Sequence, residues 1–248
     1  MGSLKNKVAI VTGSGTGIGQ ACALMFADEG ATLVLVGRRR EPLEKTASDC
    51  ESRGSSVLVL PTDLEDGDAA EKVVLQTIQH FGRVDILINN AAFRRGEDRV
   101  PILDLSEELF QRVMDIKVTG TFLCTKAVVK HMIDQGDGGK IVNISSTAGK
   151  TGAPNFLAYN GANFAIVGMT QSMARELGPQ GIHVAHFIID GAIDTPFIKE
   201  NFPDTYALKE KDGILQPKEI AEAYWNIHVQ HPSAWTQEMD LRPYMEKF

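Results

Sequence analysis

The sequence has few cysteines and no long hydrophobic run. Its three cysteines, Cys22, Cys50 and Cys124, are far apart and form no CxxC pair, which is typical of a reducing compartment and argues against a disulfide framework. No apolar run approaches the ~18 residues of a membrane-spanning helix, and the N-terminus has no signal-peptide pattern. We therefore expect a cytoplasmic protein with no membrane partner.

Dense basic clusters and metal-ligand spacings are missing too. The net charge is −7, and no segment gathers enough Lys and Arg for a nucleic-acid footprint, so no nucleic-acid partner is expected. His183 and His186 stand three apart on an expected strand, so they point to opposite faces and cannot chelate one metal. His228 and His231 flank the end of an expected helix, where we predict surface positions. No metal site is predicted.

Strand and helix patterns alternate along the whole chain. No Pro/Gly/Ser-rich linker divides the 248 residues, so we expect a single α/β domain, residues 1–248, with a Rossmann-type doubly wound parallel sheet. The expected strands are Val8–Val11, Thr32–Val36, Ser56–Leu60, Val84–Ile88, Lys140–Ile144 and His183–Ile188. The main expected helices are Ile18–Gly30, Pro42–Arg53, Asp66–Phe81, Glu107–Gln135, Ala158–Gly178 and a last one from Pro217 to about His228. The polar stretch 190–213 is predicted to be an irregular, mobile substrate loop.

The stretch from Val8 to Gly19, VAIVTGSGTGIG, predicts what the chain binds. An apolar, β-branched run leads into a glycine-rich turn, and a helical pattern follows. This order is typical of a dinucleotide site, because glycines let the backbone approach the pyrophosphate and free N–H groups at the helix start face its charge. The spacing is TGxxxGxG and not GxGxxG, since Ile18 stands where the last glycine of GxGxxG would be.

Further motifs follow the later expected strands. They are NNA at 89–91, Ser146 after the fifth strand, Tyr159 in the next helix, and DGAIDTP at 190–196 after the sixth strand. Together with Thr12–Gly19 they resemble the single-domain short-chain dehydrogenases/reductases over about residues 5–225. Two motifs differ from the usual family pattern, because NNAG is NNAA here, with Ala92, and PG before the threonine is DG. The end of the chain does not resemble the family's common tail, and we assign it no role.

The resemblance implies a set of catalytic residues. In the family a serine orients the substrate carbonyl and a tyrosine exchanges the proton, which implies these roles for Ser146 and Tyr159. A lysine four residues after the tyrosine normally supplies a cation and holds the nicotinamide ribose, and an asparagine one helix earlier supports it. Here those positions hold Asn163 and Lys117, so the two residue types have changed places.

The exchange raises the question of where the cation comes from. A free phenol has a pKa of about 10, and one cation ~4 Å away contributes roughly 4 kcal/mol toward its ionisation at an effective dielectric of about 20. We predict that Lys117 supplies this charge from the neighbouring helix, while Asn163 contacts the ribose. The alternative is that Lys117 and Asn163 are solvated surface residues, that Ser146 merely ends its strand and that Tyr159 is a half-buried aromatic.

The expected cofactor is a nicotinamide dinucleotide, with NADP(H) favoured over NAD(H). NAD-binding folds place an acidic residue at the end of the second strand to hold the ribose 2′-OH. Here Gly37 is followed by Arg38, Arg39 and Arg40, and arginine can grip a 2′-phosphate. Alternatively these arginines, Arg40 above all, are simply exposed. The predicted cofactor-binding residues are Gly13, Ser14, Thr16, Gly17, Ile18, Gly19, Arg38, Arg39, Asp63, Leu64, Asn90, Ala91, Ala92, Tyr159, Asn163, Gly191, Ile193 and Thr195.

The helix that carries Tyr159 is apolar nearly all round, more than one sheet face requires. Small residues at Gly161, Ala162, Ala165 and Gly168 would let another helix come close. In the resembled family the equivalent helix packs between subunits, so we expect a homodimer or homotetramer. The alternative is a helix buried inside the monomer.

The predicted function is the NADP(H)-dependent interconversion of a carbonyl and an alcohol on a small-molecule substrate. An alternative is a dinucleotide-binding sensor or scaffold with little or no turnover, which the missing lysine after Tyr159 favours. Arg94, Arg95 and Arg99 follow the NNAA turn, where substrate would enter. They could attract an acidic substrate, but acidic residues sit among them, and we expect a solvated loop.

Overall fold

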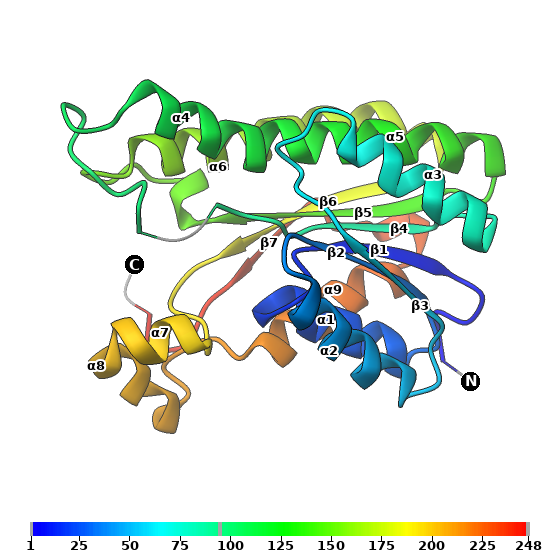
Figure 1. Ribbon diagram of the computed structural model, residues 1–248, viewed down its shortest axis with the longest axis horizontal. Coiled ribbons are helices and arrows are strands. Elements are labelled where there is room, and N and C mark those ends of the chain that lie inside the picture. Colours follow the sequence, from blue (N-terminus) through cyan, green and yellow to red (C-terminus); the bar gives the residue numbers. More distant parts are fainter. Residues whose placement is uncertain (1, 94–95, 247–248) are drawn as a thin grey trace.

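The computed structural model describes residues 2–93 and 96–246 and contains one seven-stranded, fully parallel sheet (Figure 1). The order across the sheet is β3-β2-β1-β4-β5-β6-β7. The predicted doubly wound α/β fold is confirmed. The strands are β1 Val8–Thr12, β2 Thr32–Gly37, β3 Val57–Pro61, β4 Ile86–Asn89, β5 Gly139–Ser146, β6 Ile182–Ile189 and β7 Glu238–Leu241.

Helices cover both faces of the sheet (Figure 1). One side carries α1 Gly17–Asp28, α2 Arg40–Glu51 and α9 Pro217–Val229, and the other carries α3 Ala69–Phe81, α4 Glu107–Met114, α5 Gly120–Gln135 and α6 Leu157–Leu177. Two short helices, α7 Pro196–Asn201 and α8 Pro203–Tyr206, lie beyond the ends of β6 and β7. Among the described helices, none is long and apolar enough to cross a membrane.

The two-sided burial explains why the strands are continuous apolar runs. Successive side chains of a strand point to opposite faces, so in β1 Ala9 and Val11 join the cluster under α1, α2 and α9, while Val8 and Ile10 join the one under α3, α5 and α6. All four are buried. A parallel strand covered on both faces therefore needs no polar alternation.

Three predicted segments differ from the structure. The stretch 190–213 is not irregular, because it forms α7, α8 and a 3₁₀ turn at Ala207–Lys211. The single helix expected over 107–135 is interrupted by a π-helical turn, Asp115–Thr119, between α4 and α5. The chain end, left without a role, contributes β7 to the edge of the sheet, beside β6.

The prediction of a surface position was wrong for His228. Both of its ring nitrogens are buried and have no hydrogen-bond partner among the described residues, and the ring packs edge-on against Phe26 at 5.0 Å between centroids. Burial lowers the pKa of His228 to about 3, so the ring is neutral in the fold at physiological pH. His183 Nε2 lies 2.7 Å from Thr236 O, and His186 Nε2 lies 2.9 Å from a Glu238 carboxylate oxygen.

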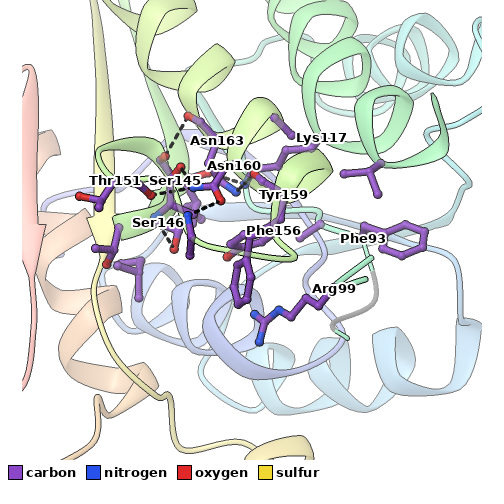
Figure 2. Close-up of a pocket in the computed structure, with 18 of the residues that line it drawn as sticks. Phe93, Arg99, Lys117, Ser145, Ser146, Thr151, Phe156, Tyr159, Asn160 and Asn163 are labelled. Carbon is purple, nitrogen blue, oxygen red and sulfur yellow. Dashed lines mark hydrogen bonds between the residues drawn. The ribbon is translucent and has the colours of Figure 1, made fainter. Parts of the chain in front are cut away.

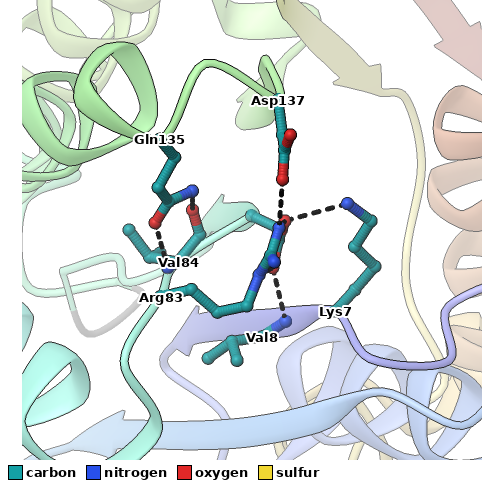
Figure 3. Close-up of polar contacts among 7 residues, drawn as sticks. Lys7, Val8, Arg83, Val84, Gln135 and Asp137 are labelled. Carbon is teal, nitrogen blue, oxygen red and sulfur yellow. Dashed lines mark hydrogen bonds and ion pairs between the residues drawn. The ribbon is translucent and has the colours of Figure 1, made fainter.

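The buried Asp85 carboxylate joins the ends of β1 and β4 that lie away from the glycine turn. Figure 3 shows its partners Lys7, Val8 and Arg83. Asp85 accepts hydrogen bonds from the Arg83 guanidinium, the Lys7 ammonium and the Val8 N–H. Although burial favours the protonated acid, these bonds hold the pKa of Asp85 below its ordinary value. The resulting stabilisation is present above the pKa of an unfolded aspartate, about 3.9, and is lost as the pH falls through the lower pKa of the fold.

Candidate active site

The glycine-rich turn between β1 and α1 lies where the strand order reverses, between β1 and β4. In such sheets, ligands bind outside the carboxyl ends of the strands at this point. Thr12 and Asn90 tie the two strand ends together: the Thr12 hydroxyl accepts the N–H of Asn90 at 2.9 Å and of Ala91 at 3.0 Å. The Asn90 amide in turn donates to Thr12 O and Gly13 O, at 3.0 and 3.2 Å.

The turn has the features that a pyrophosphate needs. Gly13 and Gly17 have left-handed backbone angles, φ +66° and +59°, which glycine adopts without strain. A Cβ at Gly13 would lie 2.8 Å from Asn90 Nδ2. The Thr16 side chain makes no capping hydrogen bond to α1, so the N–H groups of the first turn are left for an anion. These residues fit a dinucleotide.

A groove of about 750 Å³ runs along this edge of the sheet. Most of the predicted cofactor residues line it: Gly13, Thr16, Gly17, Ile18, Arg38, Arg39, Asp63, Leu64, Asn90, Ala91, Ala92, Ile193 and Thr195. Sequence reasoning missed several others, namely Gly37, Pro42, Leu43, Thr62, Ile116, Pro196, Phe197 and Glu200. The last three lie on α7, in the stretch expected to be irregular. Pro196 ends the DGAIDTP motif, whereas no sequence signal pointed to Phe197 and Glu200.

The remaining predicted cofactor residues lie elsewhere. Ser14 is buried, and its hydroxyl donates to Val36 O at 3.4 Å. Gly19 packs against the turn itself, where a Cβ would lie 2.3 Å from Gly13 O. Gly191, Tyr159 and Asn163 line a second cavity beside the groove. Ser14 and Gly19 therefore pack against the protein side of the turn and do not line the groove.

The second cavity has a volume of about 380 Å³ and brings the predicted catalytic residues together (Figure 2). Ser146 lies at the end of β5, and Tyr159 lies in the first turn of α6, half-buried. Lys117 and Asn163 line the same cavity. Four residues line both the groove and the cavity, so the two lie next to each other: Ile18, Asn90, Ala92 and Ile193.

Lys117 is not a solvated surface lysine. It lies in the π-helical turn Asp115–Thr119, a local conformation that is frequent at functional sites, and only 7 % of its surface is exposed. Its ammonium donates to the carbonyl of Ile144, two residues before Ser146 on β5. The alkyl chain therefore crosses from the helix to the strand that carries Ser146, and the charge is enclosed by protein.

Asn163 is also buried, at 2 % exposure. Its amide donates to Tyr159 O, one helical turn earlier, at 2.9 Å. The neighbouring Asn160 organises the loop after β5, because its amide donates to Ala148 O at 2.8 Å and Thr151 O at 2.7 Å. Asn160 thus connects the Tyr159 turn of α6 with the loop after β5, while the Asn163 amide bond stays within the helix.

Arg99 lines this cavity, which corrects the expectation of a solvated loop. Its guanidinium carbon lies 4.5 Å from the centre of the Phe156 ring and 5.5 Å from that of Tyr159 (Figure 2). The sequence suggested a solvated loop because the acidic residues Glu97 and Asp98 precede Arg99. The conformation of the loop decides where Arg99 lies. Arg94 and Arg95 lie outside the described residues.

The chain end makes ion pairs with the segments that flank the cavity. Arg242, just after β7, forms an ion pair with Asp190 at 3.2 Å, and the other carboxylate oxygen of Asp190 accepts the Thr147 hydroxyl. Lys150 joins the same loop to β7 through Glu238 and Asp240, at 2.7 and 2.9 Å. The tail thus positions the loop that follows Ser146.

The three consecutive arginines differ in their surroundings. Arg38 and Arg39 are exposed and line the groove beside Gly37. Arg40 does not line it and pairs with Glu44 one turn along α2, at 3.3 Å. No acidic residue stands at the end of β2, the position where a carboxylate would repel an additional phosphate.

Known proteins are similar to this chain in sequence and in fold. Residues 7–205 match the short chain dehydrogenase family. The chain is 39 % identical over 209 residues to (2S)-[(R)-hydroxy(phenyl)methyl]succinyl-CoA dehydrogenase subunit BbsD of Thauera aromatica, covering 84 % of this chain and 79 % of that protein. The structure of NAD⁺-bound xylitol dehydrogenase superposes with a TM-score of 0.87 at 29 % identity, covering 97 % and 99 % of the chains. A metagenomic short-chain oxidoreductase in complex with NADP gives 0.83 at 26 % identity, covering 98 % and 100 %.

Proposed function

This chain belongs to the short-chain dehydrogenase family, and we propose that it is an NADP(H)-dependent oxidoreductase that interconverts a carbonyl and an alcohol, with Tyr159 as the acid/base. Its relatives are named as dehydrogenases and reductases, and it acts on CH–OH or C=O groups. The observation that carries the proposal is the convergence of Ser146, Tyr159 and Lys117 on one cavity that adjoins the groove beside the glycine-rich turn.

Each catalytic side chain has a distinct task in this proposal. A bound nicotinamide dinucleotide supplies or accepts the hydride. The Ser146 hydroxyl donates a hydrogen bond to the substrate carbonyl and orients it. The Tyr159 hydroxyl gives its proton to the carbonyl oxygen in reduction and takes it back in oxidation. The enclosed Lys117 ammonium stabilises the negative charge that then develops on the phenolic oxygen.

We propose that Lys117 and Asn163 have exchanged the roles that lysine and asparagine have elsewhere in the family. The burial of Lys117 in the wall of the Tyr159 cavity supports this, because the requirement is for a cation near the oxygen and not for a particular chain position. Asn163, one turn after Tyr159, would contact the nicotinamide ribose by hydrogen bonds without supplying charge.

The cofactor would lie along the groove, with its pyrophosphate at the uncapped start of α1. Asp63 and Leu64 would flank the adenine. Arg38 and Arg39 would hold a 2′-phosphate, since guanidinium groups bind phosphate bidentately. Their place in the groove wall, with no carboxylate at the end of β2, supports NADP(H) over NAD(H).

Replacing Arg38 by alanine is expected to weaken NADPH binding by about 10- to 100-fold while NADH binding changes little, because only NADPH carries the 2′-phosphate. Fluorescence titration of both cofactors measures this. Arg40→Ala is the matched control, since Arg40 stands two residues away but outside the groove. A wild-type protein that binds NADH as tightly as NADPH would contradict the preference.

The function itself is tested by following NADPH and NADH consumption against a panel of aldehydes, ketones and quinones, with cofactor binding measured in parallel. We expect turnover of at least one carbonyl class. Binding without oxidation across the panel would instead support the alternative function, a dinucleotide-binding sensor or scaffold.

We also propose that the protein assembles as a homodimer or homotetramer through α6. Phe164 on α6 and Phe122 on α5 are 46 % and 47 % exposed, and Gly161 and Gly168 have open space where a Cβ would stand. The helix is therefore not enclosed by its own chain, and an apolar exposed face with small residues suits a second helix. A monomeric mass in sedimentation velocity would contradict this proposal.

A further inference from the structure

The cavity around Tyr159 has an unbalanced charge. Two basic side chains, Lys117 and Arg99, line it, while none of the described residues in its wall is acidic. The chain as a whole is acidic, with a net charge of −7, so the local excess of positive charge does not follow from composition. Low-dielectric walls focus such a field on the cavity, where it favours an anionic ligand.

The two cations are not equivalent. The Lys117 ammonium already has a carbonyl partner, Ile144 O. Arg99, in contrast, has a buried Nε atom with no hydrogen-bond partner among the described residues. Its guanidinium instead lies over the faces of Phe156 and Tyr159. A buried donor without a partner is rare in folded proteins and calls for an explanation.

The stacking also holds Arg99 in place. Two aromatic rings fix the plane of the guanidinium. A guanidinium that is already fixed loses little conformational entropy when it binds a carboxylate through two parallel hydrogen bonds. Because one of those rings belongs to Tyr159, the bound carboxylate would lie close to the reacting carbonyl. Phe93 and Val113 line the same cavity with apolar surface, which suits the apolar part of a substrate that carries a carboxylate.

Building on the proposed function, we propose that the substrate is an oxo acid with an apolar body, whose carboxylate is bound by Arg99 while Ser146 and Tyr159 hold its carbonyl. Arg99 is then the residue that determines substrate specificity. The reaction remains hydride and proton transfer at the carbonyl, and the carboxylate is unchanged by it.

Matched acids and esters test the proposal. The probes are 4-carboxybenzaldehyde and 4-oxopentanoate, each beside its methyl ester, with NADPH as the reductant. In the wild type we expect kcat/KM for the acid to exceed that for its ester by at least tenfold in one pair or both. In Arg99→Gln this ratio should fall by at least tenfold, mainly through KM, and Arg99→Lys should restore part of it.

A second arginine provides the control. Arg112 also lies near an aromatic ring, 5.7 Å from the centre of Phe93, but it is exposed, pairs with Glu65 and does not line the cavity. Arg112→Gln should therefore leave the acid-to-ester ratio unchanged. An equal loss of the ratio in both variants would overturn the specific role of Arg99.

A binding measurement separates this proposal from the proposed function. Calorimetry compares benzoate with methyl benzoate on the protein saturated with NADP⁺. Tighter binding of benzoate that is lost in Arg99→Gln supports the anion site even if no carbonyl turns over, a result that would overturn only the oxidoreductase function. Turnover of esters as fast as acids, with benzoate no tighter than its ester, would overturn the anion site and leave the oxidoreductase function standing.

Discussion

Replacing Lys117 by alanine is expected to lower kcat by about 100- to 1000-fold without preventing cofactor binding. A cation about 4 Å from a phenolate is worth roughly 4 kcal/mol at an effective dielectric of about 20, and each 1.4 kcal/mol is a factor of ten in rate. Lys117 is buried in the wall of the Tyr159 cavity, so solvent screens its charge little. Steady-state kinetics on a substrate found in the panel, with NADPH titration beside them, measure the effect.

The control for this loss is Lys72→Ala. Lys72 is an exposed lysine on α3, with its ammonium 4.0 Å from an Asp66 carboxylate oxygen, and its removal should leave kcat unchanged. Truncating a buried side chain to alanine leaves a cavity that can destabilise the fold. Lys117→Met is therefore measured beside Lys117→Ala, because methionine keeps the side-chain volume while it removes the charge. Full turnover in Lys117→Ala would disprove the assigned role.

The exchange of roles can be tested by reversing it. Asn163→Lys combined with Lys117→Asn restores the usual order of the family, with a lysine one turn after Tyr159. We expect the double variant to recover activity relative to Lys117→Asn alone, because the cation returns to the same cavity from α6. A double variant as inactive as Lys117→Asn would mean that the position of the charge, and not only its presence, matters.

Replacing Gly19 by alanine should weaken NADPH binding by at least about 30-fold. A Cβ at this position would lie 2.3 Å from Gly13 O and 2.6 Å from Asn90 Nδ2, distances that real side chains do not adopt. Since the Asn90 amide holds Gly13 O and Thr12 O, relief of the clash must displace the turn that would hold the pyrophosphate. Overpacking of this kind also costs about 1–3 kcal/mol of stability.

Gly67→Ala is the matched control for this substitution. Gly67 lies in the loop between β3 and α3, has no positive φ, and has nothing within 4 Å of where a Cβ would stand. Cofactor titration and thermal unfolding of both variants separate a local effect on the turn from a general loss of stability. Wild-type NADPH affinity in Gly19→Ala would show that the turn does not hold the cofactor.

Most of the fold could be predicted from local patterns. Strands buried on both faces must be short apolar runs, and the helices between them must be amphipathic, so six of the seven strands are readable in the sequence. β7 was not, because it is an edge strand in which exposed charged residues alternate with half-buried ones. Its pairing with β6 and the ion pairs from Lys150 are contacts between distant parts of the chain.

The candidate site likewise contains residues that the sequence predicted and residues that only the tertiary structure placed. The strand–glycine–helix pattern predicted the turn, and the resemblance to the short-chain dehydrogenases/reductases pointed to Ser146 and Tyr159, which lie at a strand end and a helix start. Neither the pattern nor the resemblance could place Arg99, whose acidic neighbours suggest a solvated loop. Its position over Phe156 and Tyr159 depends on how the loop after β4 packs against the start of α6.

The sequence by itself determined the alternation of strands and helices and the turn suited to a dinucleotide, because periodicity and spacing are local properties, while its resemblance to a known family supplied the catalytic tyrosine candidate. Only the tertiary structure decided that Lys117 is enclosed beside β5 and that Arg99 faces the cavity. A side chain's direction and its desolvation depend on which distant elements pack around it, and no local pattern records that packing.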